Sequence, residues 1–119
     1  MIQSPGEIRL PVRFYKSETG NEPTRDWLRQ LSRAHKKAIG EDIKTVQFGW
    51  PLGMPLVRKL EAGLWEVRTV LPDAWARVFF TMVRGELVLL HGFLKASRKT
   101  PRNELVTAQR RLKEAHGKK

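Results

Sequence analysis

The chain has 119 residues, which is enough for one compact domain with its own core and too few for two. It contains no cysteine, which excludes disulfides and thiolate metal sites, and its three histidines lack the spacing of metal ligands, so we expect neither a metal nor another cofactor. Lys and Arg number 23 against 12 Asp and Glu, and the net charge of +11 exceeds what solubility requires, which indicates a polyanionic partner.

The positive charge is concentrated near the C-terminus. From His91 onward nine Lys or Arg stand against two Glu, leaving +7 of the +11 in the last quarter of the chain. This favours binding to a nucleic acid backbone, and the alternative is a solvated helix face followed by a basic tail, residues 116–119. Since no apolar run is long enough to cross a bilayer and no signal peptide pattern is present, we expect a cytoplasmic protein without a membrane partner.

Residues 7–15 alternate loosely between apolar and polar side chains, which predicts a first strand, and Pro11 favours its placement at a sheet edge. Two helices should follow and form a helical hairpin. Thr24 stands where the N-cap of the first helix is expected, and Ser32 where that of the second is expected. The Gly and Pro residues of 49–55 then predict a loop.

The second half of the chain is rich in β-strand patterns. Short links predict an antiparallel meander of strands at residues 57–61, 64–71, 75–83 and 87–94, and the apolar last strand should be central. Thr100 as N-cap and Pro101 as the first helical residue predict a C-terminal helix. The order indicates an α+β fold, and we expect the helices on one side of a three- to four-stranded meander with the N-terminal strand added.

Three motifs carry a resemblance to a known family. They are GLWEVR at residues 63–68, RVFF at 77–80, and LHGFLK at 90–95 with the KTP of 99–101 after it. The chain resembles the phage-derived, HigB-like branch of the RelE/ParE toxin superfamily over nearly its whole length. This resemblance implies a single RelE-like domain and a toxin of a type II toxin–antitoxin pair that cleaves mRNA on the ribosome. It also implies a cognate helix-turn-helix antitoxin that holds the toxin inactive in a hetero-oligomer.

Metal-free RNA cleavage needs cations for the charge that develops at phosphorus, and groups that move protons to and from the ribose oxygens. Arg68 and Arg77 are the first candidates, because a guanidinium grips phosphate with two bonds and the meander brings their strands together. The alternative is that each is a strand residue paired with an acidic neighbour. Lys95 and Lys99 complete the catalytic set, on a predicted loop after the last strand.

Further residues are expected to contact RNA or to move protons. The expected RNA contacts are Lys59, Arg98, Arg102 and Trp75. His91 can act as an acid or base, but its apolar surroundings favour a structural, hydrogen-bonded histidine. Glu66 can act as a base, or more simply as the ion-pair partner of Arg68. Trp27 and Trp65 should lie in the core, whereas Trp50 and Trp75 can be either buried or exposed for stacking on a base.

Two other functions stay open at this point. The ParE branch poisons DNA gyrase through protein contacts and needs no catalytic residue. A non-catalytic nucleic-acid-binding module fits the basic C-terminal segment equally well.

Overall fold

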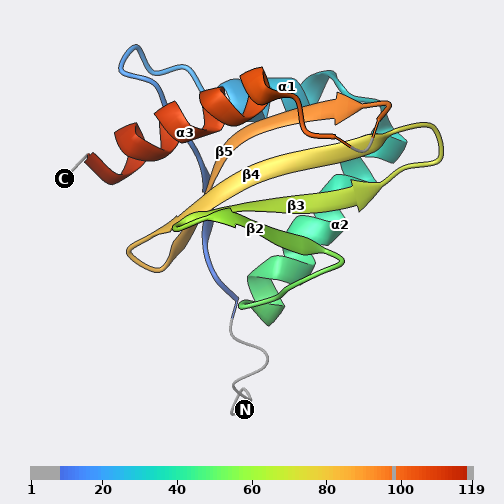
Figure 1. Ribbon diagram of the computed structural model, residues 1–119, viewed down its shortest axis with the longest axis horizontal. Coiled ribbons are helices and arrows are strands. Elements are labelled where there is room, and N and C mark those ends of the chain that lie inside the picture. The colour runs from blue at the N-terminus through green and yellow to red at the C-terminus, as the bar shows by residue number, and fades with distance from the viewer. Residues whose placement is uncertain (1–8, 98, 118–119) are drawn as a thin grey trace.

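The computed structural model describes residues 9–97 and 99–117 (Figure 1). The fold is α+β, with three helices and a mixed sheet of five strands in the order β1-β5-β4-β3-β2. In chain order the elements are β1 (Val12–Phe14), α1 (Pro23–Gln30), α2 (Arg33–Gly49), β2 (Val57–Glu61), β3 (Leu64–Val70), β4 (Trp75–Val83), β5 (Glu86–Lys95) and α3 (Arg102–Gly117).

The predicted meander is confirmed, since β2, β3, β4 and β5 pair antiparallel with their sequence neighbours. Strand β1 runs parallel to β5 and forms an edge of the sheet, as Pro11 predicted. It is shorter than the predicted 7–15, and residues 7 and 8 lie outside the described part of the chain. Strand β5 therefore lies between two strands, and its side chains are buried in a core on each face of the sheet, which explains its almost continuous apolar sequence.

Helices cover both faces of the sheet, and the expectation of helices on one side is wrong. Helix α3 lies over one face, while α1 and α2 lie behind the other (Figure 1). The reason lies in β4, where Val78 and Phe80 point to the α2 side but the intervening Phe79 points to the α3 side. Successive residues of a strand point to opposite faces, so this strand has apolar side chains on both faces. Both faces must therefore be shielded from water.

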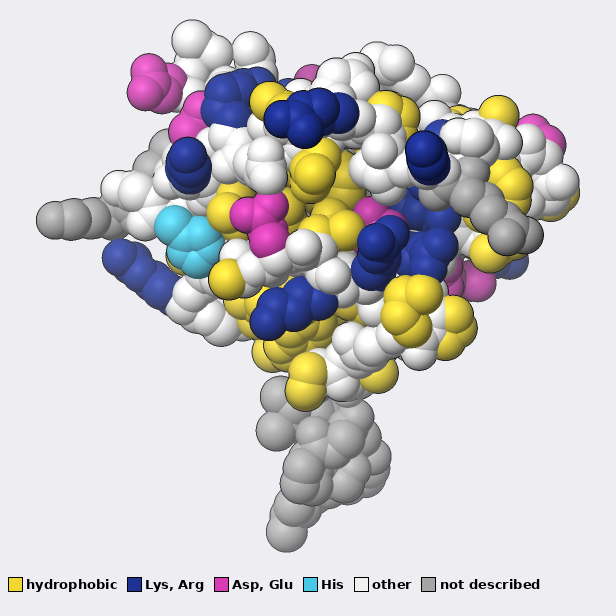
Figure 2. Space-filling view, in the orientation of Figure 1, with side chains coloured by type: hydrophobic (Ala, Val, Ile, Leu, Met, Phe, Trp, Pro, Cys, Tyr) yellow, Lys and Arg dark blue, Asp and Glu magenta, His cyan; other side chains and the backbone are white. Residues whose placement is uncertain are grey.

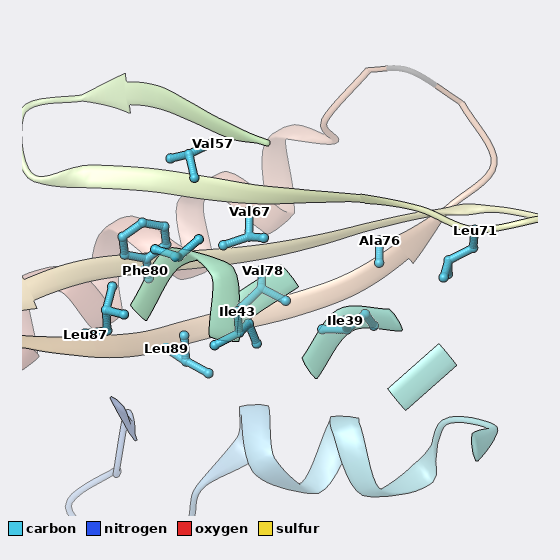
Figure 3. Packing of buried hydrophobic residues seen from close by; sticks show 11 residues of the cluster. Ile39, Ile43, Val57, Val67, Leu71, Ala76, Val78, Phe80, Leu87 and Leu89 are labelled. Carbon is cyan, nitrogen blue, oxygen red and sulfur yellow. The ribbon is translucent and has the colours of Figure 1, made fainter. Parts of the chain in front are cut away.

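The larger core lies between the sheet and α2. Ile39 and Ile43 of α2 pack on the buried side chains of the sheet, among them Val78 and Leu89 (Figure 3). The smaller core beneath α3 includes Phe79, Leu90 and Ala108. Trp65 and Trp50 both belong to the larger core, where their ring centroids lie 4.9 Å apart, so Trp50 is a packing residue.

The helix starts differ in part from the sequence expectation. Ser32 caps α2 as predicted, and its hydroxyl accepts a hydrogen bond from the His35 amide. Thr24 is not the cap of α1, because the helix begins at Pro23, a residue that suits a first helical position, and Glu22 stands at the cap position. Thr100 is not a cap either, since its buried hydroxyl makes no hydrogen bond.

The glycine of the LHGFLK motif has a packing role. Gly92 faces the ring of Trp27, and a β-carbon at this position would lie 2.3 Å from Cζ3 of that ring. Only glycine therefore lets α1 approach β5 so closely. In the described residues, none of the helices has both the length and the apolar composition needed to cross a bilayer.

Candidate functional site

Arg68 and Arg77 lie side by side on the sheet. They are directly opposite each other in the β3–β4 register, so their side chains share one face. This is the face that α3 partly covers, because Phe79, two residues from Arg77 on β4, packs beneath that helix. Arg77 is 2% exposed and Arg68 is partly exposed.

Glu66 lies between the two arginines on the same face of β3. Its Oε1 atom is 3.4 Å from Nε of Arg77 and 3.7 Å from Nε of Arg68. The carboxylate is 1% exposed and, unlike Arg68 and Arg77, it does not line the neighbouring pocket. This geometry places Glu66 as the shared ion-pair partner of both guanidinium groups, which is the simpler of the two roles expected for it.

Lys95 belongs to the strand and not to the predicted loop. It is the last residue of β5, lies opposite Trp75, and is 8% exposed. Burial lowers the pKa of its ammonium group, and the positive charge of Arg77 lowers it further. The strand continues to this point because β4 begins at Trp75 and supplies backbone partners up to its end.

Burial also lowers the pKa of Arg77, and repulsion by Arg68 adds to this effect while Glu66 opposes it. A guanidinium stays protonated in proteins despite such shifts. Burial and the neighbouring arginines therefore outweigh the stabilisation that Glu66 gives to the positive charge of Arg77. An anion bound beside it would relieve this cost.

Arg58 is a fourth cation of the site that the sequence reasoning missed. It lies opposite Glu66 in the β2–β3 register, whereas Lys59 lies opposite Trp65, whose ring packs in the core on the other face. A bulge between Lys59 and Glu61 causes this arrangement. A regular two-residue hairpin would place Lys59 opposite Glu66, and a register shift of one residue exchanges the faces.

The arginine pair borders a pocket. Its volume is about 240 Å³, and Pro55, Val70 and Trp75 line it together with Arg68 and Arg77. Figure 2 shows the same face, where dark blue basic side chains gather beside a partly hidden acidic group to the right of centre. Trp75 is partly exposed here, so its ring is available at the pocket wall.

The site has more positive charge than its own acid neutralises. Arg58, Arg68, Arg77 and Lys95 interact electrostatically with one another around Glu66, and four cations against one carboxylate leave a local charge of +3. We call these five residues the basic cluster. Several of its buried atoms, namely Nε of Arg68, Nε of Arg77 and Oε2 of Glu66, make no hydrogen bond within the described chain. The two Nε atoms face Oε1 of Glu66 in the ion pairs, and an anion in the pocket would accept hydrogen bonds from the remaining N–H groups of Arg68 and Arg77.

His91 lies away from the pocket and is held by hydrogen bonds. Its Nε2 is 2.9 Å from a carboxylate oxygen of Glu104, and Arg111 donates to its Nδ1 at 3.3 Å. Since arginine only donates, Nδ1 carries no proton and Nε2–H donates to Glu104. Phe93 stacks on the imidazole and separates it from the Arg77 position, which lies opposite Phe93. His91 therefore has the surroundings of a structural histidine.

The remaining predicted residues lie outside the basic cluster. Lys99 is exposed on the loop before α3, and Arg102 is exposed at the first position of α3. Arg98 lies outside the described residues. Within residues 9–97 and 99–117, no three His, Asp or Glu side chains come together in a group that could hold a metal ion.

The chain matches a described protein family. A family model described as phage-derived protein Gp49-like matches residues 26–113 of the chain. This range contains all five residues of the basic cluster and the whole antiparallel meander. A search of curated proteins found no match.

Proposed function

The chain belongs to the Gp49-like family of phage-derived proteins, a toxin-like family of the RelE/HigB type, and we propose that it is the toxin of a type II toxin–antitoxin pair. In this proposal the protein cleaves mRNA on the ribosome without a metal, in the manner of the HigB-like branch. A separately encoded helix-turn-helix antitoxin holds it inactive. The observation that carries the proposal is the basic cluster beside an open pocket.

The chemistry follows from the charges of the cluster. The ribose 2′-oxygen attacks the adjacent phosphorus and gives its proton to water, the phosphorus–5′-oxygen bond breaks, and a 2′,3′-cyclic phosphate and a 5′-hydroxyl result. Negative charge grows on the phosphoryl oxygens during this step, and preorganised cations stabilise it. Arg68 and Arg77 are fixed by Glu66 beside the pocket, so little reorganisation is needed when substrate binds.

We assign Lys95 as the donor of a proton to the leaving 5′-oxygen. The guanidinium groups of the cluster do not release protons at neutral pH, whereas an ammonium group can. Burial and the charge of Arg77 lower the pKa of Lys95, which makes it a stronger acid than an exposed lysine. Proton donation by such a group is a recognised contribution to catalysis.

Trp75 is suited to hold the base next to the scissile phosphate. It lines the same pocket as the arginines and is partly exposed. Stacking of an unpaired base on an aromatic ring contributes about 1–3 kcal/mol and accepts any base. Specificity for a codon would then come from how the ribosome positions the mRNA, and not from stacking on Trp75.

Expression in a bacterium, followed by mapping of RNA 5′ ends and of DNA breaks, tests the proposal. We expect new 5′ ends inside translated mRNA, and co-expression of the antitoxin should abolish them and restore growth. Gyrase-linked DNA breaks without RNA cuts would favour the ParE-type activity. Binding to RNA with neither kind of cut would leave a non-catalytic binding module.

Matched substitutions separate chemistry from general charge. Arg68→Gln should reduce cleavage at least 100-fold, in line with the loss of one oriented donor to a developing oxyanion. Arg29→Gln removes the same charge from an exposed site on α1, behind the opposite face of the sheet, and should leave cleavage unchanged. Equal losses in both variants would contradict a specific role for Arg68.

A further inference from the structure

A second basic pocket lies at the other end of β4. It has a volume of about 280 Å³, and Arg13, Lys16 and Arg84 line it together with a single acid, Glu86. Tyr15, from the core beneath α3, also lines it. We infer that this pocket is a second phosphate-binding site, which holds the backbone of the same RNA strand that enters the basic cluster.

The charges of the second pocket favour an anion. Glu86 pairs with Arg13, whose Nε lies 3.4 Å from a carboxylate oxygen, and the three cations against one carboxylate leave a charge of +2. Both partners of this pair are more than 40% exposed, so the pair is weak and exchanges readily for contacts with phosphate. A guanidinium is the group that binds phosphate with two parallel bonds.

The position of Arg84 supports a role in binding. Arg84 and Gly85 form the two-residue turn between β4 and β5, with φ angles of +50° and +81°. Asn-Gly is the usual sequence of such a turn, because a side chain other than that of Asn or Asp is disfavoured at positive φ. An arginine here is costly for the turn and places a cation at its tip, beside the pocket.

The two pockets lie on the same face at a distance that one RNA strand can span. Strand β4 has nine residues and runs from Trp75 at the first pocket to Val83 at the second. Eight steps of about 3.3 Å give a separation of roughly 26 Å. At about 3.4 Å per stacked nucleotide this corresponds to roughly eight nucleotides, and to fewer if the strand is extended.

The surface between the pockets carries further cations. Arg102, Arg110 and Lys113 are exposed along α3, which lies between the two ends of the sheet, and Arg110 pairs with Glu114 at 3.5 Å. Figure 2 shows dark blue side chains along the upper part of this face, where Figure 1 places α3. A polyanion that left the first pocket would therefore meet further cations on its way to the second.

A phosphate backbone fits this surface better than an acidic protein segment does. Protein interfaces depend on buried aromatic and apolar anchors. The second pocket offers only Val83, Ala115 and the largely buried Tyr15 for such contacts, and its volume is below the usual range of ligand pockets. A phosphodiester needs cations and little volume, which is what the pocket supplies.

The test compares two variants with equal loss of charge. The pocket variant carries Arg13→Gln, Lys16→Gln and Arg84→Asn, the last chosen because asparagine tolerates the positive φ of the turn. The control variant carries Arg33→Gln, Lys36→Gln and Lys37→Gln, three exposed cations of α2 behind the opposite face. A single cooperative urea transition in each variant will show that both are folded.

Binding is measured with 2′-O-methyl RNA of twelve and of four nucleotides, which lacks the attacking hydroxyl and is not cleaved. For the twelve-nucleotide RNA, we expect the pocket variant to bind at least tenfold more weakly than the control variant. Its slope of log affinity against log salt should be smaller by about 0.7 for each phosphate that the variant no longer binds. For the four-nucleotide RNA the two variants should differ by no more than twofold, because this strand is too short to reach both pockets.

Two results would overturn the inference. Equal affinities and salt slopes of the two variants for the long RNA would mean that the pocket holds no phosphate of this strand. A tenfold weakening that is equal for the long and the short RNA would mean that no strand spans the two pockets. The identification of the ligand as RNA rests on the proposed function, but binding of uncleavable RNA is measured independently of cleavage. Failure of the nuclease proposal and failure of the second site are therefore distinguishable.

Discussion

Arg77 can serve as the ion-pair partner of Glu66, as a phosphate-binding residue, or as both. A double substitution separates these two roles. The Nε of Arg77 is 3.4 Å from Oε1 of Glu66, and at an effective dielectric constant of about 20 this attraction amounts to about 5 kcal/mol. Removal of one partner of a buried pair costs about 3–5 kcal/mol. Because Arg68 remains 3.7 Å from the same oxygen, we expect Arg77→Met to cost about 3 kcal/mol.

Urea unfolding and thermal melting measure this loss. A chain of 119 residues has an unfolding entropy of about 250 cal/mol/K, so a loss of 3 kcal/mol lowers the Tm by about 12 °C. In the double variant Glu66→Gln with Arg77→Met neither charge of the pair is left buried alone. We expect it to recover at least half of the lost stability, with a coupling energy of about 2 kcal/mol.

Cleavage of mRNA gives the decisive readout. If Arg77 grips phosphate, the double variant regains stability but stays at least 100-fold less active than the native chain. Recovery of activity together with stability would show that Arg77 is only the counter-ion of Glu66. Unchanged stability of Arg77→Met alone would refute the buried-pair argument itself.

Three further predictions use neighbouring residues as internal controls. In a titration with uncleavable RNA, Arg58→Gln should weaken binding about tenfold and Lys59→Gln by less than twofold. The reason is that the bulge turns only Arg58 toward the basic cluster, so a larger effect at Lys59 would contradict the register. The pKa of Lys95 in the folded state lies below its ordinary 10.5, so its charge costs stability below the folded pKa, and this cost is relieved as pH rises toward 10.5. In urea titrations the native chain should therefore gain stability relative to Lys95→Met across that interval, and a constant difference would exclude the shift. Gly92→Ala should lower the free energy of unfolding by about 1–3 kcal/mol or more, because the added methyl group overpacks the contact with Trp27. Gly40 has open space around its Cα, so Gly40→Ala should raise the free energy of unfolding by up to about 1 kcal/mol. Equal effects of the two substitutions in thermal melting would refute the packing argument.

Much of the fold was predictable because local signals agree with one another. The predicted bounds of β2 and β4 match the structure, those of β3 differ by one residue at one end, and those of β5 differ by one residue at each end. Gly63 and Gly85 adopt positive φ in two-residue turns, which fixes where the neighbouring strands begin and end. Alternation within the strands then determines which residues share a face.

Part of the candidate site was predictable for the same reason. Arg68 and Arg77 occupy consecutive strands of one hairpin, and the residues of its turn bring them opposite each other. Arg58 was not predictable, because a bulge leaves no clear mark in the sequence and shifts the register by one residue. Lys95 was misplaced because the end of β5 depends on where β4 begins, which is a contact distant along the chain.

By itself the sequence determined the order of elements, the turns and the excess of positive charge, since these depend on residues close together in the chain. Only the tertiary structure decided that helices cover both faces, that Glu66 lies between two arginines, and that a second basic pocket is formed by Arg13, Lys16 and Arg84. The physical reason is that each of these features joins residues from different elements. Their distances follow from strand register and core packing, which no local pattern specifies.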